Sequence, residues 1–306
     1  MIYINYSFRI KLVYPFAPHL LTQSFLILHT TLLAFTFDGT AYSTGVNDAT
    51  LTSHGVVYAA GSVRALRVAG IAGNSSGSSS TYAALAKKVD GSATVANAPA
   101  VAGYSVKTAL TDGINGLDLG TGITNLPTAA IMTFSIFNIT PSKIADNEPD
   151  IIITQIAQPV AGNDFFSFID ASGSVVGTSI SQDMTLLARF GTYDLDLFNL
   201  TPNTPWNTAT VYSAAIPSTN REIRLVGFRL SDFGITSLNV GQIKALKITP
   251  SGNSDYAFIA YNANAINIPP NISQNDAATN TTIRNGGVAN LAVIGSSSSG
   301  EALNYS

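Results

Sequence analysis

The chain has 306 residues, of which 46% are hydrophobic and only 11% are charged, against about 25% charged residues in typical soluble domains. Ser, Thr and Asn together supply 86 residues, and this shortage of helix-favouring Lys and Glu predicts an all-β protein. The net charge of −3, without a Lys/Arg cluster, excludes nucleic acid and anionic membranes as partners, and the absence of Cys excludes disulfides, thiolate metal sites and Cys nucleophiles.

Residues 1–37 are predicted to be a leader. Arg9 and Lys11 precede an apolar stretch from Ser24 to Phe37, whose 14 residues are too few for the roughly 20 that span a bilayer. This pattern is typical of a signal peptide and implies no further membrane span. The alternatives are a buried N-terminal helix or a start codon recorded upstream of the true domain.

Residues 38–268 are predicted to form one antiparallel, jelly-roll-like β-sandwich, because short β-type runs alternate with turn signals. A Ser/Gly-rich run at 73–80 is predicted to be a loop, and 81–89 the one short helix. A hairpin is expected around Gly173. The predicted strands are 56–60, 63–71, 131–138, 150–157, 165–170, 174–180, 184–190, 209–215, 222–230, 243–249 and 256–262.

A domain boundary is predicted at Pro269-Pro270, because two prolines cannot donate to a β-ladder. The tail at 269–306 is too short for an independently stable β unit. We therefore expect it to be the truncated start of a further domain.

Several segments of the chain resemble a family of large secreted surface proteins of Bacteroidetes. These proteins are adhesin-like and gliding-motility-associated, with a β-sandwich before Ig-like or PKD-like repeats. The resemblance covers residues 104–268, and the tail resembles the opening of an Ig-like repeat. It implies a secreted or cell-surface location and a binding or structural role. The segments that carry it are 112–127, 149–156, 168–173, 230–235 and 254–262.

A candidate calcium loop precedes the predicted strand at 150–157. Asp146, Glu148 and Asp150 follow one another at every second position, and Pro149 keeps the segment from being helical. Spacing by two presents successive oxygens to one hard cation. The loop lacks the glycine and distal glutamate of an EF-hand, so the alternative is a solvated turn.

A second oxygen-rich loop contains Asp112, Asn115 and Asp118 among several glycines. Asp112 is a candidate to complete the metal site, and Asn115 and Asp118 are candidates for a glycan-binding rim. The alternative is ordinary Asx and Gly turn chemistry, which needs no ligand.

Trp206, the single tryptophan, lies in a loop with Pro202 and Pro205. An exposed loop aromatic would stack on the apolar face of a sugar ring, so Trp206 is a candidate ligand-binding residue. The alternative is a packing role at a strand edge.

Catalytic patterns are weak in this sequence. Gly73-x-Ser75-x-Gly77 fits the nucleophile-elbow pattern, but an elbow needs a strand before it and a helix after it. His54 is the only histidine outside the predicted leader. A glycosidase pair stays open, because two carboxylates can come from any strands.

The sequence thus favours a non-enzymatic, extracellular, adhesin-like module that binds polysaccharide or a surface glycan, with loops stiffened by Ca²⁺. Abundant Ser, Thr and Asn would suit hydrogen bonding to a neutral polysaccharide. The alternatives are a secreted carbohydrate-active enzyme or its ancillary domain, and a passive structural stalk. An enzyme would need carboxylates that converge in a cleft, at least one of them with a raised pKa.

Overall fold

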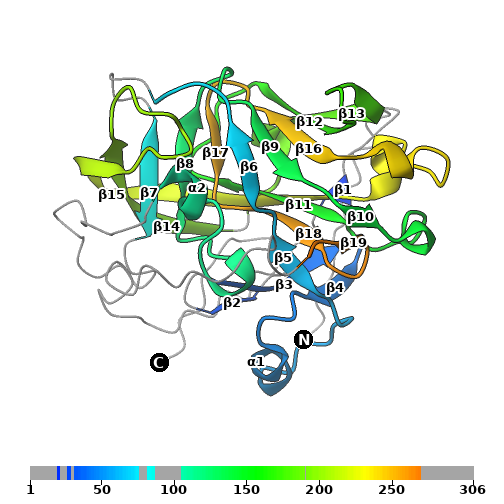
Figure 1. Cartoon of the computed structure of the whole chain (residues 1–306). Helices are drawn as coiled ribbons and strands as arrows, with labels where there is room; N and C mark the ends of the chain where they lie inside the picture. Colours follow the sequence, from blue (N-terminus) through cyan, green and yellow to red (C-terminus); the bar gives the residue numbers. More distant parts are fainter. Residues whose placement is uncertain are drawn as a thin grey trace.

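The computed structural model describes residues 19–20, 26–28, 31–75, 81–86, 105–189 and 191–269. This part of the chain is mostly antiparallel β-structure (Figure 1), which confirms the predicted all-β sandwich class. Its helices are the short α1 (Asp48–Ser53) and α2 (Val106–Ala109). Apart from Pro269, the predicted Ig-like segment at 269–306 lies outside the described residues.

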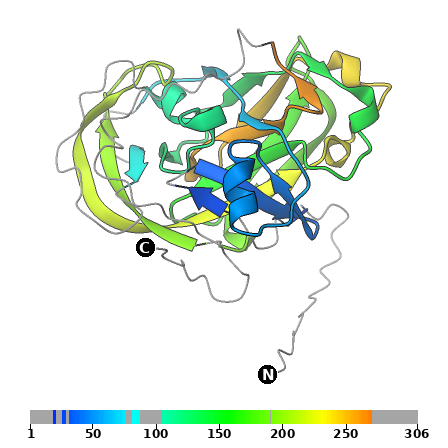
Figure 2. The same cartoon turned by 90° about the horizontal axis from the view of Figure 1, so that it is seen from below.

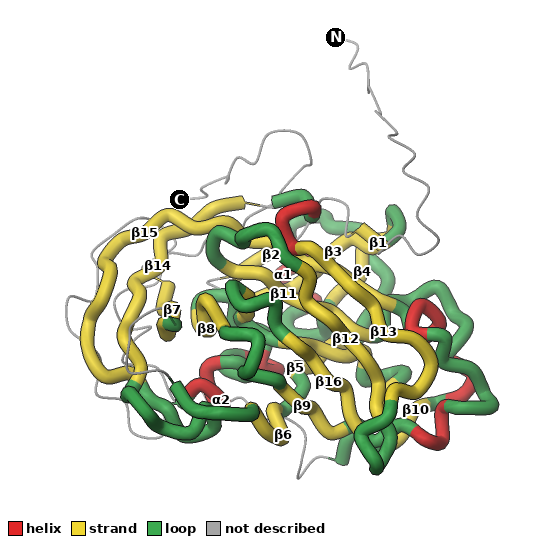
Figure 3. The backbone as a smooth tube through the Cα atoms, turned by 90° about the horizontal axis from the view of Figure 1, so that it is seen from above, coloured by secondary structure: helices red, strands yellow, loops and turns green. Residues whose placement is uncertain are grey.

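The largest sheet curls back on itself. Its strands lie in the order β17 (Ser254–Tyr256), β8 (Thr121–Leu126), β7 (Tyr82–Ala86), β14 (Gly191–Leu200), β15 (Val211–Phe228), β11 (Ile151–Ile156), β18 (Ile259–Asn262) and β5 (Val63–Ala65). β1 (His19–Leu20) also pairs with β15. In Figure 3 the long strands β14 and β15 arch around β7 and β8. The curl brings β17 against β11, where the Thr154 hydroxyl accepts hydrogen bonds from the backbone N–H groups of Ala257 and Phe258.

A second sheet packs on the first and completes the sandwich. It consists of β13 (Val175–Asp183), β12 (Asn163–Ile169), β16 (Ala245–Thr249), β9 (Met132–Ser135) and β6 (Val68–Ile71). The first core lies between the two sheets, where the rings of Phe166 and Phe228 are 5.7 Å apart and those of Phe168 and Phe233 are 4.8 Å apart. Such aromatic pairs add stability beyond their buried area.

A third, small layer covers the other face of the curled sheet. It is formed by β2 (Leu26–Leu28), β3 (Thr31–Phe37) and β4 (Thr40–Ser43), which lie across the molecule beside α1 in Figure 2. On β11, Ile151 and Ile153 enter the first core, whereas Ile152 enters a second core shared with Phe35. Burial on both faces explains why β11 begins with three consecutive isoleucines.

Short elements connect these layers. β10 (Asn138–Ile139) pairs with β19 (Ile266–Asn267). The 3-10 helices are η1 (Ile114–Gly116), η2 (Pro141–Lys143), η3 (Met184–Leu186), η4 (Leu230–Phe233) and η5 (Val240–Gln242). No helix among the described residues combines the length and the apolar character needed to cross a membrane.

The folded domain starts earlier than the sequence indicates. The predicted leader includes residues 31–37, whereas the structure places them in β3, with Phe35 and Phe37 buried in the second core. A Cβ at Gly227 would lie 2.9 Å from the Phe37 ring, so this glycine makes room for it. An apolar run of this length fits a signal peptide and a buried strand equally well.

Several predicted elements differ from the structure. The helix predicted at 81–89 is wrong: Tyr82–Ala86 is the strand β7, held between β8 and β14. The strands predicted at 209–215 and 222–230 are parts of the single long β15, and 184–190 contains the 3-10 helix η3. Tertiary pairing thus overrides the helix propensity of an Ala-rich segment. The hairpin around Gly173 is confirmed as β12 and β13.

Candidate functional site

The predicted calcium loop contains its own cation. The Lys143 ammonium lies 3.0 Å from Asp146 Oδ2 and 3.2 Å from Glu148 Oε1. Both carboxylates raise the pKa of Lys143, with the Asp146 hydrogen bond as the largest cause. The backbone N–H of Glu148 donates to Asp146 Oδ1, and Asn262 Nδ2 donates to Glu148 Oε2. Lys143 thus balances one of the two negative charges, and the loop is a hydrogen-bonded turn, close to the alternative interpretation of the sequence.

Asp150 faces away from the solvent in the same segment. Its side chain is 1% exposed, and Oδ2 accepts a hydrogen bond of 2.8 Å from the backbone N–H of Leu230. Burial raises the pKa of Asp150 to about 8, and the charges of Asp146 and Glu148 add to this effect. A carboxyl group that holds its proton near neutrality is a poor calcium ligand.

The second oxygen-rich loop is held by internal hydrogen bonds. Buried Asp118 accepts from the backbone N–H of Gly120 and from the Thr121 hydroxyl, and Asp112 accepts from the N–H of Gly113. Asn115 on η1 accepts from Arg64 Nη1 at 2.9 Å. This is the Asx and Gly turn chemistry of the alternative reading. Within the described ranges, no three His, Asp or Glu side chains are grouped to hold a metal ion.

Trp206 is a core residue and not an exposed platform. It is 1% exposed and belongs to the first core, and its backbone N–H donates to the Gly73 carbonyl. The prediction that Trp206 stacks on a sugar is therefore wrong for this conformation. Its loop is anchored through Ser75, whose N–H donates to the Thr204 carbonyl. Ser75, the nominal elbow serine, is thus a buried structural residue.

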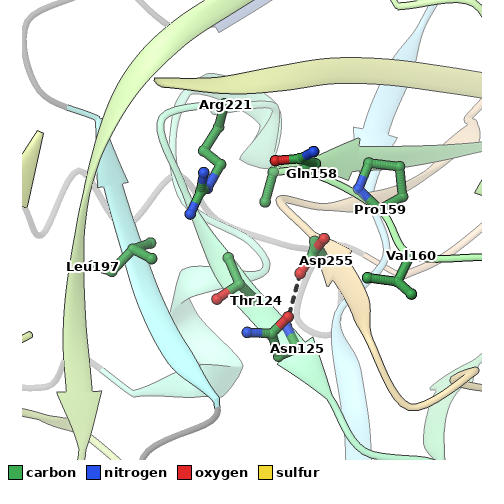
Figure 4. A pocket seen from close by; sticks show the side chains of 9 residues that line it. Thr124, Asn125, Gln158, Pro159, Val160, Leu197, Arg221 and Asp255 are labelled. Atoms are coloured by element: carbon green, nitrogen blue, oxygen red, sulfur yellow. Dashed lines mark hydrogen bonds between the residues drawn. The ribbon is translucent and has the colours of Figure 1, made fainter. Parts of the chain in front are cut away.

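A pocket that the sequence did not indicate lies where the large sheet curls. It has a volume of about 230 Å³. In Figure 4 its side chains come from different strands and surround one space. We call it the Asp255 pocket. Its polar lining consists of Thr124 and Asn125 from β8, Gln158 after β11, Arg221 from β15 and Asp255 from β17. Its apolar lining consists of Ala157, Pro159, Val160 and Leu197.

Asp255 contributes a buried carboxyl group to this pocket. It is 1% exposed, and it accepts hydrogen bonds from the Asn125 backbone N–H at 2.7 Å and from Gln155 Nε2 at 2.6 Å. Burial raises the pKa of Asp255 to about 7, while these two hydrogen bonds and the Arg221 guanidinium oppose the shift. The side chain therefore exchanges a proton near neutral pH.

The backbone around the pocket is strained. Ala157 has a φ of +119° and Asn125 a φ of +55°, in the region that glycine prefers. Asn is one of the residues that tolerate it, but Ala is not. The Ala157 N–H donates to the Glu222 carbonyl, which fixes the turn after β11. Backbone strain of this kind gathers at functional sites.

A close approach of three strands also supports the pocket. A Cβ at Gly122 on β8 would lie 2.4 Å from the Tyr256 carbonyl oxygen and 2.4 Å from Ile156 Cδ1. Glycine at this position therefore lets β8 lie tightly against β17 and β11. On either side of Asp255 in the chain, the Ser254 and Tyr256 hydroxyls both donate hydrogen bonds of 2.6 Å to Asp164.

Comparison of the chain with protein-family models, curated proteins and solved structures found no match. The functional argument consequently starts from the geometry of the Asp255 pocket.

Proposed function

We propose that this domain is a non-catalytic, extracellular binding module of an adhesin-like protein. Its site is the Asp255 pocket, and its ligand is a neutral sugar unit of a polysaccharide or surface glycan. This proposal keeps the function that the sequence favours and moves it to a different set of residues.

The observation that carries the proposal is the mixture of hydrogen-bonding groups in one pocket. Asp255 presents carboxyl oxygens, Arg221 presents a guanidinium, and Thr124 presents a hydroxyl group. Vicinal hydroxyl groups of a sugar both donate and accept, so acceptors and donors fixed side by side fit them. The apolar wall of Pro159 and Val160 suits the C–H face of a sugar ring.

The composition supports a neutral glycan over a charged partner. Charged residues make up 11% of the chain, and the net charge is −3. Long-range electrostatic steering would therefore be weak, and recognition would depend on short-range hydrogen bonds and shape. The resemblance to Bacteroidetes surface proteins supports the extracellular location.

A carbohydrate-active enzyme is the second candidate, and the raised pKa of Asp255 favours it. A carboxyl group with a pKa of about 7 could serve as a general acid. Glycoside hydrolysis commonly needs a second carboxyl group facing the first. Asp255 is the one carboxylic acid among the described residues that line the pocket, so binding is the preferred proposal.

The test is a calorimetric titration of the full chain with neutral polysaccharides such as dextran and galactomannan. We expect Arg221→Gln to weaken binding about tenfold, because it removes a charged donor at the pocket. Asp255→Asn should weaken it similarly, and it should fold, because the new amide can donate to a reoriented Gln155.

The matched control is Arg189→Gln, which removes an exposed arginine paired with Glu222 outside the pocket. It should leave binding unchanged. Equal binding by the wild type and both pocket variants would overturn the proposed site. Release of reducing ends by the wild type, abolished in Asp255→Asn, would replace binding by hydrolysis. No binding and no release would favour the stalk.

A further inference from the structure

A second pocket, distinct in lining from the first, carries two positive charges. It has a volume of about 220 Å³. Its lining includes residues of α2 and β6, two elements that lie near each other in Figures 1 and 3. Arg67 precedes β6, Lys107 belongs to α2, and Phe137 follows β9.

Among the described residues, no acidic side chain forms an ion pair with either cation. The ion pairs between described residues involve Lys143, Arg189, Arg224 and Arg229. No carboxylic acid is among the residues that line the second pocket. Instead, the positive charge of Arg67 lies near enough to Lys107 to affect it.

The positive charges of Arg67 and Lys107 oppose each other. Burial lowers the pKa of Lys107, and the positive charge of Arg67 lowers it further. An anion between the two side chains would reverse the second effect, since an opposite charge favours the charged form of a lysine. The site therefore gains most from a ligand with a negative charge.

The third feature is an exposed aromatic ring. Phe137 is 46% exposed, although a phenylalanine at the end of a strand would normally be covered. Ser135 adds a hydroxyl group and Ile268 an apolar side chain to the same lining. A ring face beside two cations fits a ligand that combines an apolar face with an oxyanion.

We propose that Arg67, Lys107 and Phe137 form a second binding site, which takes an acidic sugar. Its carboxylate or sulfate group binds Arg67 and Lys107, and its ring packs on Phe137. The sugar part of this ligand rests on the proposed function, whereas the oxyanion part rests on the two cations alone. The domain would then bind a neutral unit of a glycan in the Asp255 pocket and an acidic unit of the same glycan in the second pocket.

The experiment is a titration of the full chain with glucuronate, glucose and inorganic sulfate, followed by heteronuclear NMR and calorimetry. We expect glucuronate to bind and glucose to leave the signals around Lys107 unchanged. Arg67→Gln and Lys107→Gln should each weaken glucuronate binding about tenfold, the loss expected for one charge-assisted hydrogen bond. Higher salt should weaken it as well, because Arg67 is exposed.

Two control variants separate this site from the Asp255 pocket. Lys244→Gln removes an exposed lysine that lines neither pocket, and Asp255→Asn alters the first pocket alone. Both should bind glucuronate like the wild type. Loss of glucuronate binding in Asp255→Asn would assign the ligand to the first pocket and overturn the second site.

The remaining outcomes distinguish the two parts of the proposal. Glucuronate binding that survives the double variant Arg67→Gln/Lys107→Gln would overturn the site. Sulfate that binds as tightly as glucuronate, with no effect of Phe137→Ala on either, would overturn the sugar part of the proposal and leave a site for an oxyanion. Absence of binding by both probes would overturn the whole proposal, independently of the result with neutral polysaccharides.

Discussion

Gln155 on β11 donates a hydrogen bond of 2.6 Å from Nε2 to Oδ2 of Asp255 on β17. The two strands are not neighbours in the sheet, and the curl of β8, β7, β14 and β15 separates them along the path of hydrogen-bonded strands. Both side chains are buried. This hydrogen bond therefore helps to close the curl and orients the carboxyl group that lines the pocket.

Replacement of this glutamine should destabilise the fold. We expect Gln155→Leu to lower the free energy of unfolding by about 1–3 kcal/mol, because Asp255 would lose a buried donor. Urea denaturation measures the change. Gln158→Leu makes the same chemical change at an exposed position and should stay within about 0.5 kcal/mol of the wild type. Equal stability of the two variants would contradict a structural role for the Gln155 contact.

The two buried carboxyl groups should make the protein less stable as the pH rises. The pKa of Asp150 is raised to about 8 and that of Asp255 to about 7, from 3.8. Between about pH 4 and these values the folded chain holds protons that the unfolded chain has released. Each group should therefore lower the free energy of unfolding by at most about 1.4 kcal/mol per pH unit across that window. Urea melts from pH 4 to 8 test this slope.

A substitution of Asp150 tests whether this residue causes the fall in the free energy of unfolding with rising pH. Asp150→Asn should match the wild type near pH 4 and be more stable at pH 8, because it removes the cost of a buried charge. Asp170→Asn is the control: hydrogen bonds from Ser172 and Ser174 lower the pKa of Asp170, so the contribution of Asp170 to stability is present above about pH 4. That variant should keep the wild-type slope between pH 5 and 8. A wild-type stability that rises with pH in this range would refute the assignment.

The sandwich was predictable because its signals are local. The hairpin of β12 and β13 has a turn with Asp170 and Gly173, and the Asp170 N–H donates a hydrogen bond to the Ser174 carbonyl. The strand β7 was not predictable in this way, since Ala83 and Ala84 carry no β signal of their own. Their strand forms because β8 and β14 offer hydrogen-bonding partners on both sides.

The site was less predictable than the fold, for a physical reason. The sequence shows acidic residues close together in the chain, and Lys143, which lies outside the acidic motif, offsets part of their charge. The Asp255 pocket brings together side chains more than a hundred positions apart, such as Asn125 and Asp255. One weak signal was present: Asp255 follows Ser254 at the start of an otherwise apolar segment, where a buried acid needs a special environment.

Relief of the backbone strain at Ala157 should be measurable. An Ala→Gly change inside a strand normally costs about 0.5–1 kcal/mol. At a φ of +119° glycine is the preferred residue, so Ala157→Gly should instead hold or raise the free energy of unfolding, by up to about 1 kcal/mol. Ala84→Gly on β7 is the matched control, where ordinary strand pairing predicts a loss. A loss of equal size in both variants would show that the turn after β11 carries no strain.

The acidic loop gives the sharpest test of the calcium hypothesis. Lys143 occupies the position between Asp146 and Glu148 that a cation would take, so we expect neither calcium nor a chelator to change the Tm of the wild type. Lys143→Gln should lower stability by about 1 kcal/mol, because two carboxylates lose their counter-charge.

That same variant should respond to calcium. With the ammonium gone, millimolar Ca²⁺ should raise the Tm of Lys143→Gln and restore part of the lost stability, since a ligand that binds only the folded state stabilises it. Lys247→Gln, a lysine of β16 outside this loop, should gain nothing from calcium. A fall in the wild-type Tm on chelation would mean that calcium displaces Lys143, and the original reading of Asp146, Glu148 and Asp150 as calcium ligands would then hold.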